Sequence, residues 1–136
     1  VVMAVLALKG GACGGEATLG VTEARSRPAI GPNGAVYLTI EGGVVDTALL
    51  EVSAPSSVSA MVEIHQTVIR DDGAMGMTPI SHVEIPADST VMMVPGGMHV
   101  MLIDLAEPLA LGDTFDMTLT FDDGTELATT VEVRDE

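Results

Sequence analysis

Short runs of alternating apolar and polar residues recur along most of the chain, and turn-forming residues separate them. Alternation of this kind places apolar side chains on one face of a β-strand and polar side chains on the other. No stretch has a helical period of useful length. The pattern predicts about eight strands: Ala17–Glu23, Ala35–Glu41, Ala48–Ser53, Val58–Arg70, Thr90–Val94, Met98–Leu105, Thr114–Phe121 and Glu126–Val133.

The last two expected strands form the clearest hairpin. Apolar Phe115, Met117, Leu119 and Phe121 alternate with polar residues, and Asp122-Asp123-Gly124 then turns the chain back. Several short strands separated by turn signals favour an all-β sandwich over an α/β fold. At 136 residues the chain fits one domain, which we expect to span residues 17–136.

The net charge and the residue composition argue against two classes of function, nucleic-acid binding and catalysis. The formal net charge of −15 repels nucleic acid, so we expect no DNA- or RNA-binding role. No Ser-His-Asp arrangement, paired carboxylates or Gly-rich phosphate loop stands out, and we therefore expect no enzyme. There are nine methionines but only three histidines. Because methionine often fills gaps in a core, its placement matters more than its number.

The N-terminal residues resemble the end of an export signal. Residues 1–8 are continuously apolar but too few to span a bilayer, which needs about 20 residues. Small residues precede Cys13, the single cysteine, as in bacterial lipoproteins. A lipidated Cys13, a plain secretory signal and an incidental cysteine all remain open. We interpret residues 1–16 as a residual leader and linker, and we expect an extracytoplasmic domain whose membrane contact is at most a lipid on Cys13.

Four residues form a candidate metal site: His65, Met77, His99 and Met101. Imidazole and thioether donors together suit Cu(I), because soft sulfur ligands select it over harder divalent ions. In an extended strand His99 and Met101 share a face. Taken singly, each has an ordinary explanation, such as a solvated His65 or a Met101 packed in the core. His82 is assigned no role.

The joint spacing resembles the periplasmic copper chaperones of the PCuAC family. Met77 and His99 are separated by 21 residues and His99 and Met101 by one, as in the family signature, whereas the interval from His65 to Met77 is one residue longer. The extra residue falls in the turn 71–73, which absorbs an insertion more easily than a strand. Thr67 stands where many members carry Met or His. Flanking phrases also match: Val62-Glu63-Ile64-His65, Met75-Gly76-Met77-Thr78-Pro79, Pro95-Gly96-Gly97 and Pro108-Leu109 with Leu111-Gly112-Asp113.

The resemblance implies a cupredoxin-like, Greek-key β-sandwich that binds one Cu(I) per chain through His65, Met77, His99 and Met101. It also implies delivery of copper toward cytochrome c oxidase assembly, with the oxidase copper subunit or a second copper chaperone as partner. A blue-copper redox protein is excluded, because it needs a Cys ligand within the sandwich.

Three questions stay open from the sequence. A secreted interaction module with a decayed metal site is the alternative function, motivated by Thr67 and the inserted residue. Cu(II) could occupy the same site with Met75 or an acidic residue as an added ligand. Whether Met75 or Met98 assists the four candidate ligands is also undecided.

Overall fold

A computed structural model describes residues 18–135, and these residues form ten strands and no helix. The interpreted leader, residues 1–16 with Cys13, lies outside the described residues. Within residues 18–135 no helix is present that could cross a membrane. The strands are β1 Gly20–Ser26, β2 Asn33–Glu41, β3 Thr47–Ser53, β4 Ser59–Ile69, β5 Met75–Pro79, β6 Val83–Ile85, β7 Thr90–Met92, β8 Met98–Leu105, β9 Thr114–Phe121 and β10 Glu126–Val133.

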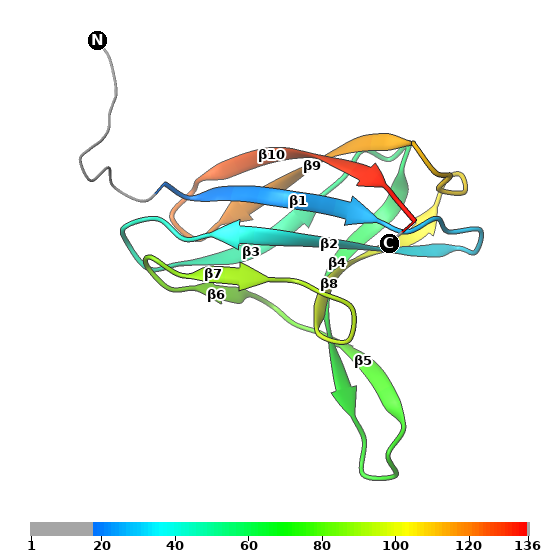
Figure 1. Cartoon of the computed structure of the whole chain (residues 1–136), viewed down its shortest axis with the longest axis horizontal. Coiled ribbons are helices and arrows are strands. Elements are labelled where there is room, and N and C mark those ends of the chain that lie inside the picture. The colour runs from blue at the N-terminus through cyan, green and yellow to red at the C-terminus, as the bar shows by residue number, and fades with distance from the viewer. Residues whose placement is uncertain (1–17, 136) are drawn as a thin grey trace.

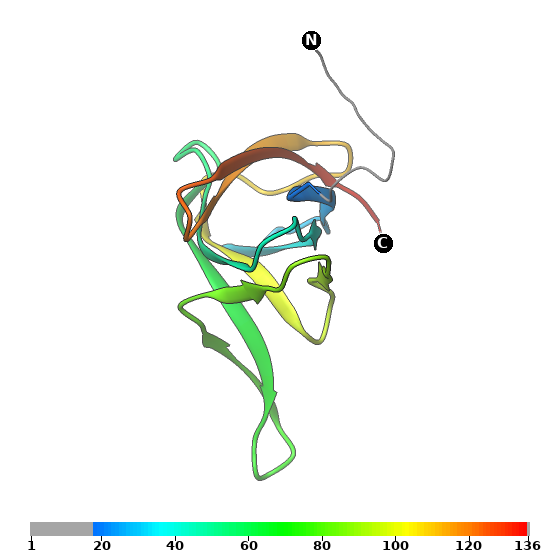
Figure 2. The same ribbon diagram turned by 90° about the vertical axis from the view of Figure 1, so that its left-hand side faces the viewer.

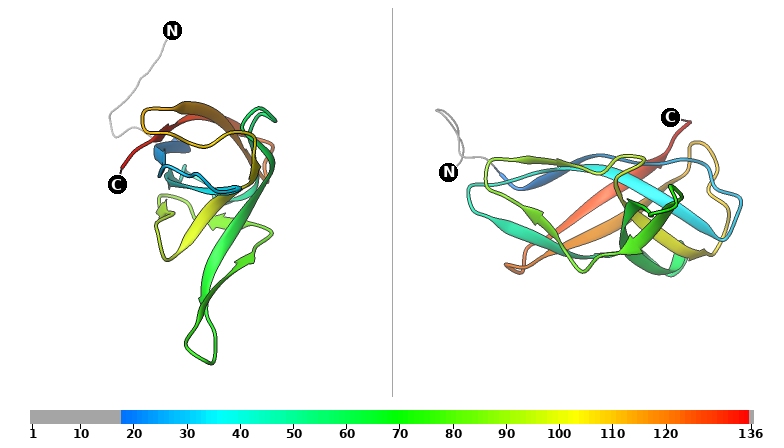
Figure 3. Two further views of the ribbon diagram at one scale, coloured as in Figure 1. Left: turned by 90° about the vertical axis from the view of Figure 1, so that its right-hand side faces the viewer. Right: turned by 90° about the horizontal axis from the view of Figure 1, so that it is seen from below.

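The strands are hydrogen-bonded in the order β5-β4-β8-β2-β1-β10-β9-β3-β6, and β7 pairs with β2. Strands β1 and β10 run parallel, and the other pairs are antiparallel. The sheet curls over on itself, so that β9 and β10 lie across the interior from β2 and β8 (Figures 2 and 3). The predicted all-β sandwich is confirmed.

Alternation along the strands builds the core and leaves a second face outside it. Val100 and Leu102 of β8 are completely buried in the interior, and Ile64 of β4 joins them. Burying each large aliphatic side chain stabilises the fold by about 1.5–3 kcal/mol. Because neighbours in a strand point to opposite faces, the same pattern turns His65, His99 and Met101 away from this core.

Sequence patterning located most strands but missed two. The expected bounds of β8, β9 and β10 agree with the structure residue for residue. Strand β5 contains Gly76 and Pro79, which have low strand propensity, and it forms through pairing with β4. Strand β6 has three residues, too few to show alternation.

Strands β4 and β5 form a hairpin that projects beyond the sandwich (Figure 1). Val68 alternates in step with the buried Ile64, but it lies on the projecting part of the hairpin and is 36% exposed. The turn is compact: the Arg70 N–H donates to the Ala74 carbonyl at 2.8 Å and the Gly73 N–H to the Arg70 carbonyl at 2.9 Å. Gly73 has a φ of +85°, which favours glycine.

The turn between β9 and β10 repeats this arrangement around Asp122-Asp123-Gly124. The Phe121 N–H donates to the Thr125 carbonyl and the Gly124 N–H to the Phe121 carbonyl, with a φ of +89° at Gly124. In both turns a side-chain carboxylate accepts from a backbone N–H two residues later. The turn 71–73, in which the longer interval between His65 and Met77 is expected to be absorbed, is therefore a regular hairpin turn next to an intact β4–β5 pairing.

Replacement of Phe121 by alanine is expected to destabilise the sandwich by about 3–5 kcal/mol, because a large, fully buried side chain leaves a cavity in the core. Denaturant unfolding measures the change. Leu50→Ala is the control, since Leu50 is half exposed and its loss should change the free energy of unfolding by about 0.5 kcal/mol or less. Equal effects of the two variants would contradict this account of the core.

Candidate metal centre

The register between β4 and β8 places His65 directly opposite His99. Side chains that face each other across an antiparallel pair have Cβ atoms about 4.5–5.5 Å apart. The two imidazole ring centroids are 5.8 Å apart, with an angle of 54° between the ring planes. Two histidines that are far apart in the sequence are thus neighbours on the outer face of the sandwich.

The two methionines lie on this same face. Met77 of β5 is the cross-strand partner of Thr67, which shares a face with His65 because the two are two residues apart. Met101 follows His99 by two residues in β8. Met77, His99 and Met101 line one open cavity of about 500 Å³, and His65 lies beside it against His99. The structure therefore brings all four sequence-derived candidates to one region.

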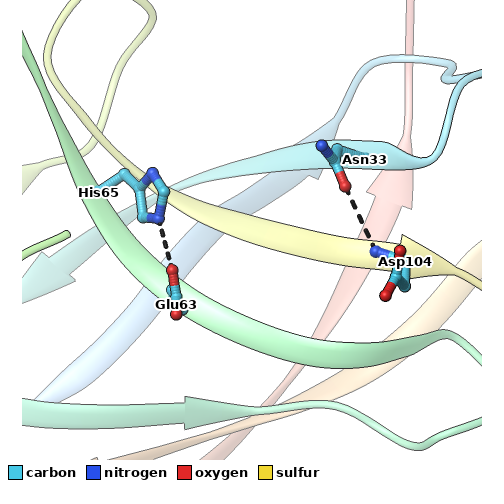
Figure 4. A network of polar contacts seen from close by, with 4 residues as sticks. All are labelled: Asn33, Glu63, His65 and Asp104. Atoms are coloured by element: carbon cyan, nitrogen blue, oxygen red, sulfur yellow. Dashed lines mark hydrogen bonds and ion pairs between the residues drawn. The ribbon is translucent and has the colours of Figure 1, made fainter. Parts of the chain in front are cut away.

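The two imidazoles each carry a buried nitrogen without a protein partner, His65 Nδ1 and His99 Nε2. The other nitrogen of His65, Nε2, lies 2.8 Å from Glu63 Oε1 (Figure 4). A buried polar atom without a hydrogen bond costs about 1–3 kcal/mol. A cation that accepts the lone pairs of both nitrogens would remove that cost, and the donor set fits a metal ion.

Burial and charge keep His99 neutral near pH 7. The pKa of His99 is lowered, first by burial, which disfavours the charged imidazolium, and next by the nearby His65. A backbone hydrogen bond at Gly97 opposes both effects but does not reverse them. Because a metal binds the neutral imidazole, the lowered pKa leaves this ring ready to bind.

The structure distinguishes Met75, which lines the cavity of the candidate ligands, from Met98 and His82, which do not. Met75 lines the same cavity as Met77, whereas Met98 lies in a different hollow with Gln66 and His82. Met98 precedes His99 in β8 and so points to the opposite face. His82 is exposed and contacts Ser81 and Glu84. Of the two methionines left open by the sequence, Met75 is the one placed to assist.

Tyr37 and Glu63 contact the histidines without being candidate ligands. The Tyr37 ring centroid lies 6.2 Å from that of His99. The Arg25 guanidinium, on the neighbouring strand β1, lies 5.9 Å from the centroid of the Tyr37 ring. Alternation along the strand places Glu63 beside His65, because it precedes His65 by two residues and shares its face. Tyr37 comes from β2, and only strand pairing shows that it reaches His99.

Oxygen and nitrogen ligands alone do not form a site here. Within the part of the chain that the structure describes, no group of three or more His, Cys, Asp and Glu side chains is arranged to hold a metal ion. Beside the two imidazoles, the further soft donors on this face are the thioethers of Met77 and Met101. A set of this composition favours a soft, univalent ion.

The fold and this cluster define a β-sandwich with paired imidazoles and thioethers on an outer face. Residues 19–133 match the family described as "Putative lipoprotein LpqE-like", and the chain belongs to this family. A protein of Leifsonia xyli subsp. xyli with the description of a lipoprotein is 37% identical over 84 residues, 62% of this chain and 51% of that protein. An uncharacterized protein of Rickettsia prowazekii is 38% identical over 73 residues, 53% and 40% of the two chains. The chain thus spans about half the length of these relatives, or less.

Solved structures of the same shape are PCuAC domains. The copper-bound PCuAC domain from PmoF2 superposes with a TM-score of 0.69 at 20% identity, covering 90% of this chain and 99% of that domain. The Cu(I) form of DR1885 from Deinococcus radiodurans has a TM-score of 0.66 at 26% identity, covering 91% and 84%. The resemblance to the PCuAC family and the cupredoxin-like β-sandwich expected from it are confirmed.

The lowered pKa of His99 predicts how the stability of the metal-free protein depends on pH. The folded state binds the proton on His99 less readily than the unfolded state, whose imidazole titrates near 6.5. The stabilising contribution is fully present above pH 6.5 and is lost as the pH falls below it. Unfolding free energies measured between pH 7.5 and 5 should therefore decrease, and His99→Gln should flatten this dependence. His82→Gln is the control, and an equal flattening there would contradict the assignment.

Proposed function

We propose that this protein is an extracytoplasmic copper carrier that binds one Cu(I) through His65, Met77, His99 and Met101. The observation that carries the proposal is the pair of buried, partnerless imidazole nitrogens beside two thioethers on one face. Family membership and the shape shared with copper-bound PCuAC domains support it.

The distance between the histidines favours this function over the decayed-site alternative. That alternative requires His65 and His99 to lie beyond the joint reach of one ion. A metal–imidazole bond is about 2 Å long, so a separation of 5.8 Å between the ring centroids leaves room for one ion between the rings. Thr67 contributes no sulfur or imidazole donor, but Met77 faces it across the strand pair and occupies the same part of the surface.

The gradient of burial among the ligands fits transfer to another protein. His99 is 4% exposed, Met101 is partly buried, and Met77 is 56% exposed on the projecting hairpin. An acceptor would meet Met77 first and could displace this neutral, weakly bound thioether before the imidazoles. Thioethers need no deprotonation to bind metal, unlike cysteine thiols, which suits a site outside the reducing cytoplasm. Transfer by ligand exchange needs no redox step, so the function is that of a carrier rather than an enzyme.

We also propose where the domain is located and which protein accepts its copper. A leader at residues 1–16, a sandwich from residue 17 onward and a lipid on Cys13 would place the domain on the outer side of a membrane. The lipoprotein description of the family supports this placement. The acceptor is a copper protein of cytochrome c oxidase assembly, either the copper subunit of the oxidase or a second copper chaperone. Nucleic acid is not a partner, because the net charge is −15.

Titration with Cu(I) under reducing conditions, in competition with a chromophoric Cu(I) chelator, tests the ligand set. The wild-type protein should bind one equivalent, and the double variant Met77→Ala with His99→Ala should lose tight binding because one imidazole and one thioether are removed. His82→Ala and Met98→Ala are matched controls, since both residues lie outside the cavity. Binding that is equally strong in the double variant would contradict the proposed site.

Selectivity tests the role of sulfur separately. Zinc prefers three or four nitrogen, oxygen or thiolate ligands, and the described residues do not offer such a group. A large excess of Zn²⁺ should therefore leave Cu(I) binding unchanged in a competition titration. Replacing Met77 and Met101 together by His should allow Zn²⁺ to compete. Strong Zn²⁺ competition in the wild-type protein would show that the thioethers do not define the site.

A further inference from the structure

Glu63 makes a polar contact with the His65 ring, and the proposed ligand set does not use this carboxylate. Its Oε1 atom lies 2.8 Å from His65 Nε2 (Figure 4). The two residues are two positions apart on β4, so both side chains lie on the outer face of the sandwich. Glu63 is also the cross-strand partner of Met101. Glu63 is therefore a neighbour of two proposed ligands, along its own strand and across the strand pair.

This contact determines which nitrogen of His65 is free. An ionised carboxylate only accepts hydrogen bonds, so Nε2 carries the proton and donates it to Glu63. In the neutral ring Nδ1 then keeps its lone pair. Nδ1 is also the buried nitrogen that has no hydrogen-bond partner. Geometry and protonation thus select the same atom of His65 for metal binding.

We propose that Glu63 is a positioning residue that holds His65 in its Nε2–H tautomer and presents Nδ1 to Cu(I). This inference rests on the proposed copper site and names the ligand atom and its support. A carboxylate hydrogen-bonded to the distal nitrogen fixes the orientation of a metal-binding imidazole and raises its basicity. The His65 side chain is 13% exposed and that of Glu63 is 38% exposed, so water competes only partly for this contact.

A second Glu–His pair in the chain provides a matched control. Glu84 and His82 are also two positions apart, but their closest atoms are 3.8 Å apart and both side chains are exposed. The pair lies outside the cavity of the proposed ligands. Removing Glu84 deletes the same charge from the surface without touching His65.

The experiment compares the wild-type protein with Glu63→Ala, Glu63→Gln and Glu84→Ala. The first readout is NMR of the metal-free, ¹⁵N-labelled protein, which reports the tautomer of His65 and the exchange of its Nε2 proton with water. We expect a slowly exchanging Nε2 proton in the wild type and in Glu63→Gln, because the amide oxygen also accepts a hydrogen bond. We expect faster exchange in Glu63→Ala and no change in Glu84→Ala.

The second readout is Cu(I) binding by the same variants. Loss of an outer hydrogen-bond partner typically lowers metal affinity by about 10- to 100-fold, and we expect this for Glu63→Ala. Glu63→Gln should recover most of the loss, and Glu84→Ala should bind like the wild type. On Cu(I) loading the ¹⁵N shift of His65 Nδ1 should move while Nε2 keeps its proton.

Several results would overturn the inference. Cu(I) bound at Nε2, an unprotonated Nε2 in the metal-free protein, or unchanged affinity in Glu63→Ala would each contradict the positioning role. A Glu63→Gln variant as weak as Glu63→Ala would show that the charge, or direct binding by the carboxylate, is what matters. Failure of the wild-type protein to bind Cu(I) would contradict the proposed function itself, and the inference with it.

Discussion

The register of β4 against β8 is the constraint on which the outer face depends. It sets His65 opposite His99 and, two residues along, Glu63 opposite Met101. The inward residues of the same strands, Ile64 and Val100, face each other in the core. A shift of one residue would move the buried side chains to solvent and the histidines into the core, at a large cost in hydrophobic free energy. Core packing therefore holds the two imidazoles in place.

The β4–β5 hairpin extends this arrangement beyond the sandwich. Its turn is closed by backbone hydrogen bonds and a glycine at positive φ, and the pairing places Met77 across from Thr67. The hairpin has few core contacts, and its side chains Ile69, Met75 and Met77 are exposed. The outer face thus combines His65, His99 and Met101 on strands of the sandwich with Met77 on the open strand β5. In the proposed copper site, the imidazoles would retain the ion and the exposed thioether of Met77 would allow its exchange.

Electrostatics acts on the two histidines in different ways. Burial lowers the pKa of His99 and favours the neutral ring. His65 Nε2 instead lies 2.8 Å from the Glu63 carboxylate. Each ring has one nitrogen that is buried without a protein partner, Nδ1 of His65 and Nε2 of His99. A buried polar atom without a partner is unfavourable, and its presence on two facing rings supports the proposed copper site.

Local sequence determined the strands whose side chains alternate, because a core packed on one face imposes a period of two. Met98–Leu105, Thr114–Phe121 and Glu126–Val133 were predicted with their observed bounds for this reason.

The four candidate ligands came from spacing within a family resemblance, and the one-residue insertion made His65 the least secure of them. Alternation along one strand could place His99 with Met101, but it could not state what lies opposite. Pairing between strands that are distant in sequence brings His65 next to His99 and Tyr37 next to His99. It also places Met75, but not Met98, beside the candidate ligands. Only the tertiary structure decided these contacts between strands, because register is set by the packing of the whole core rather than by the residues of one strand.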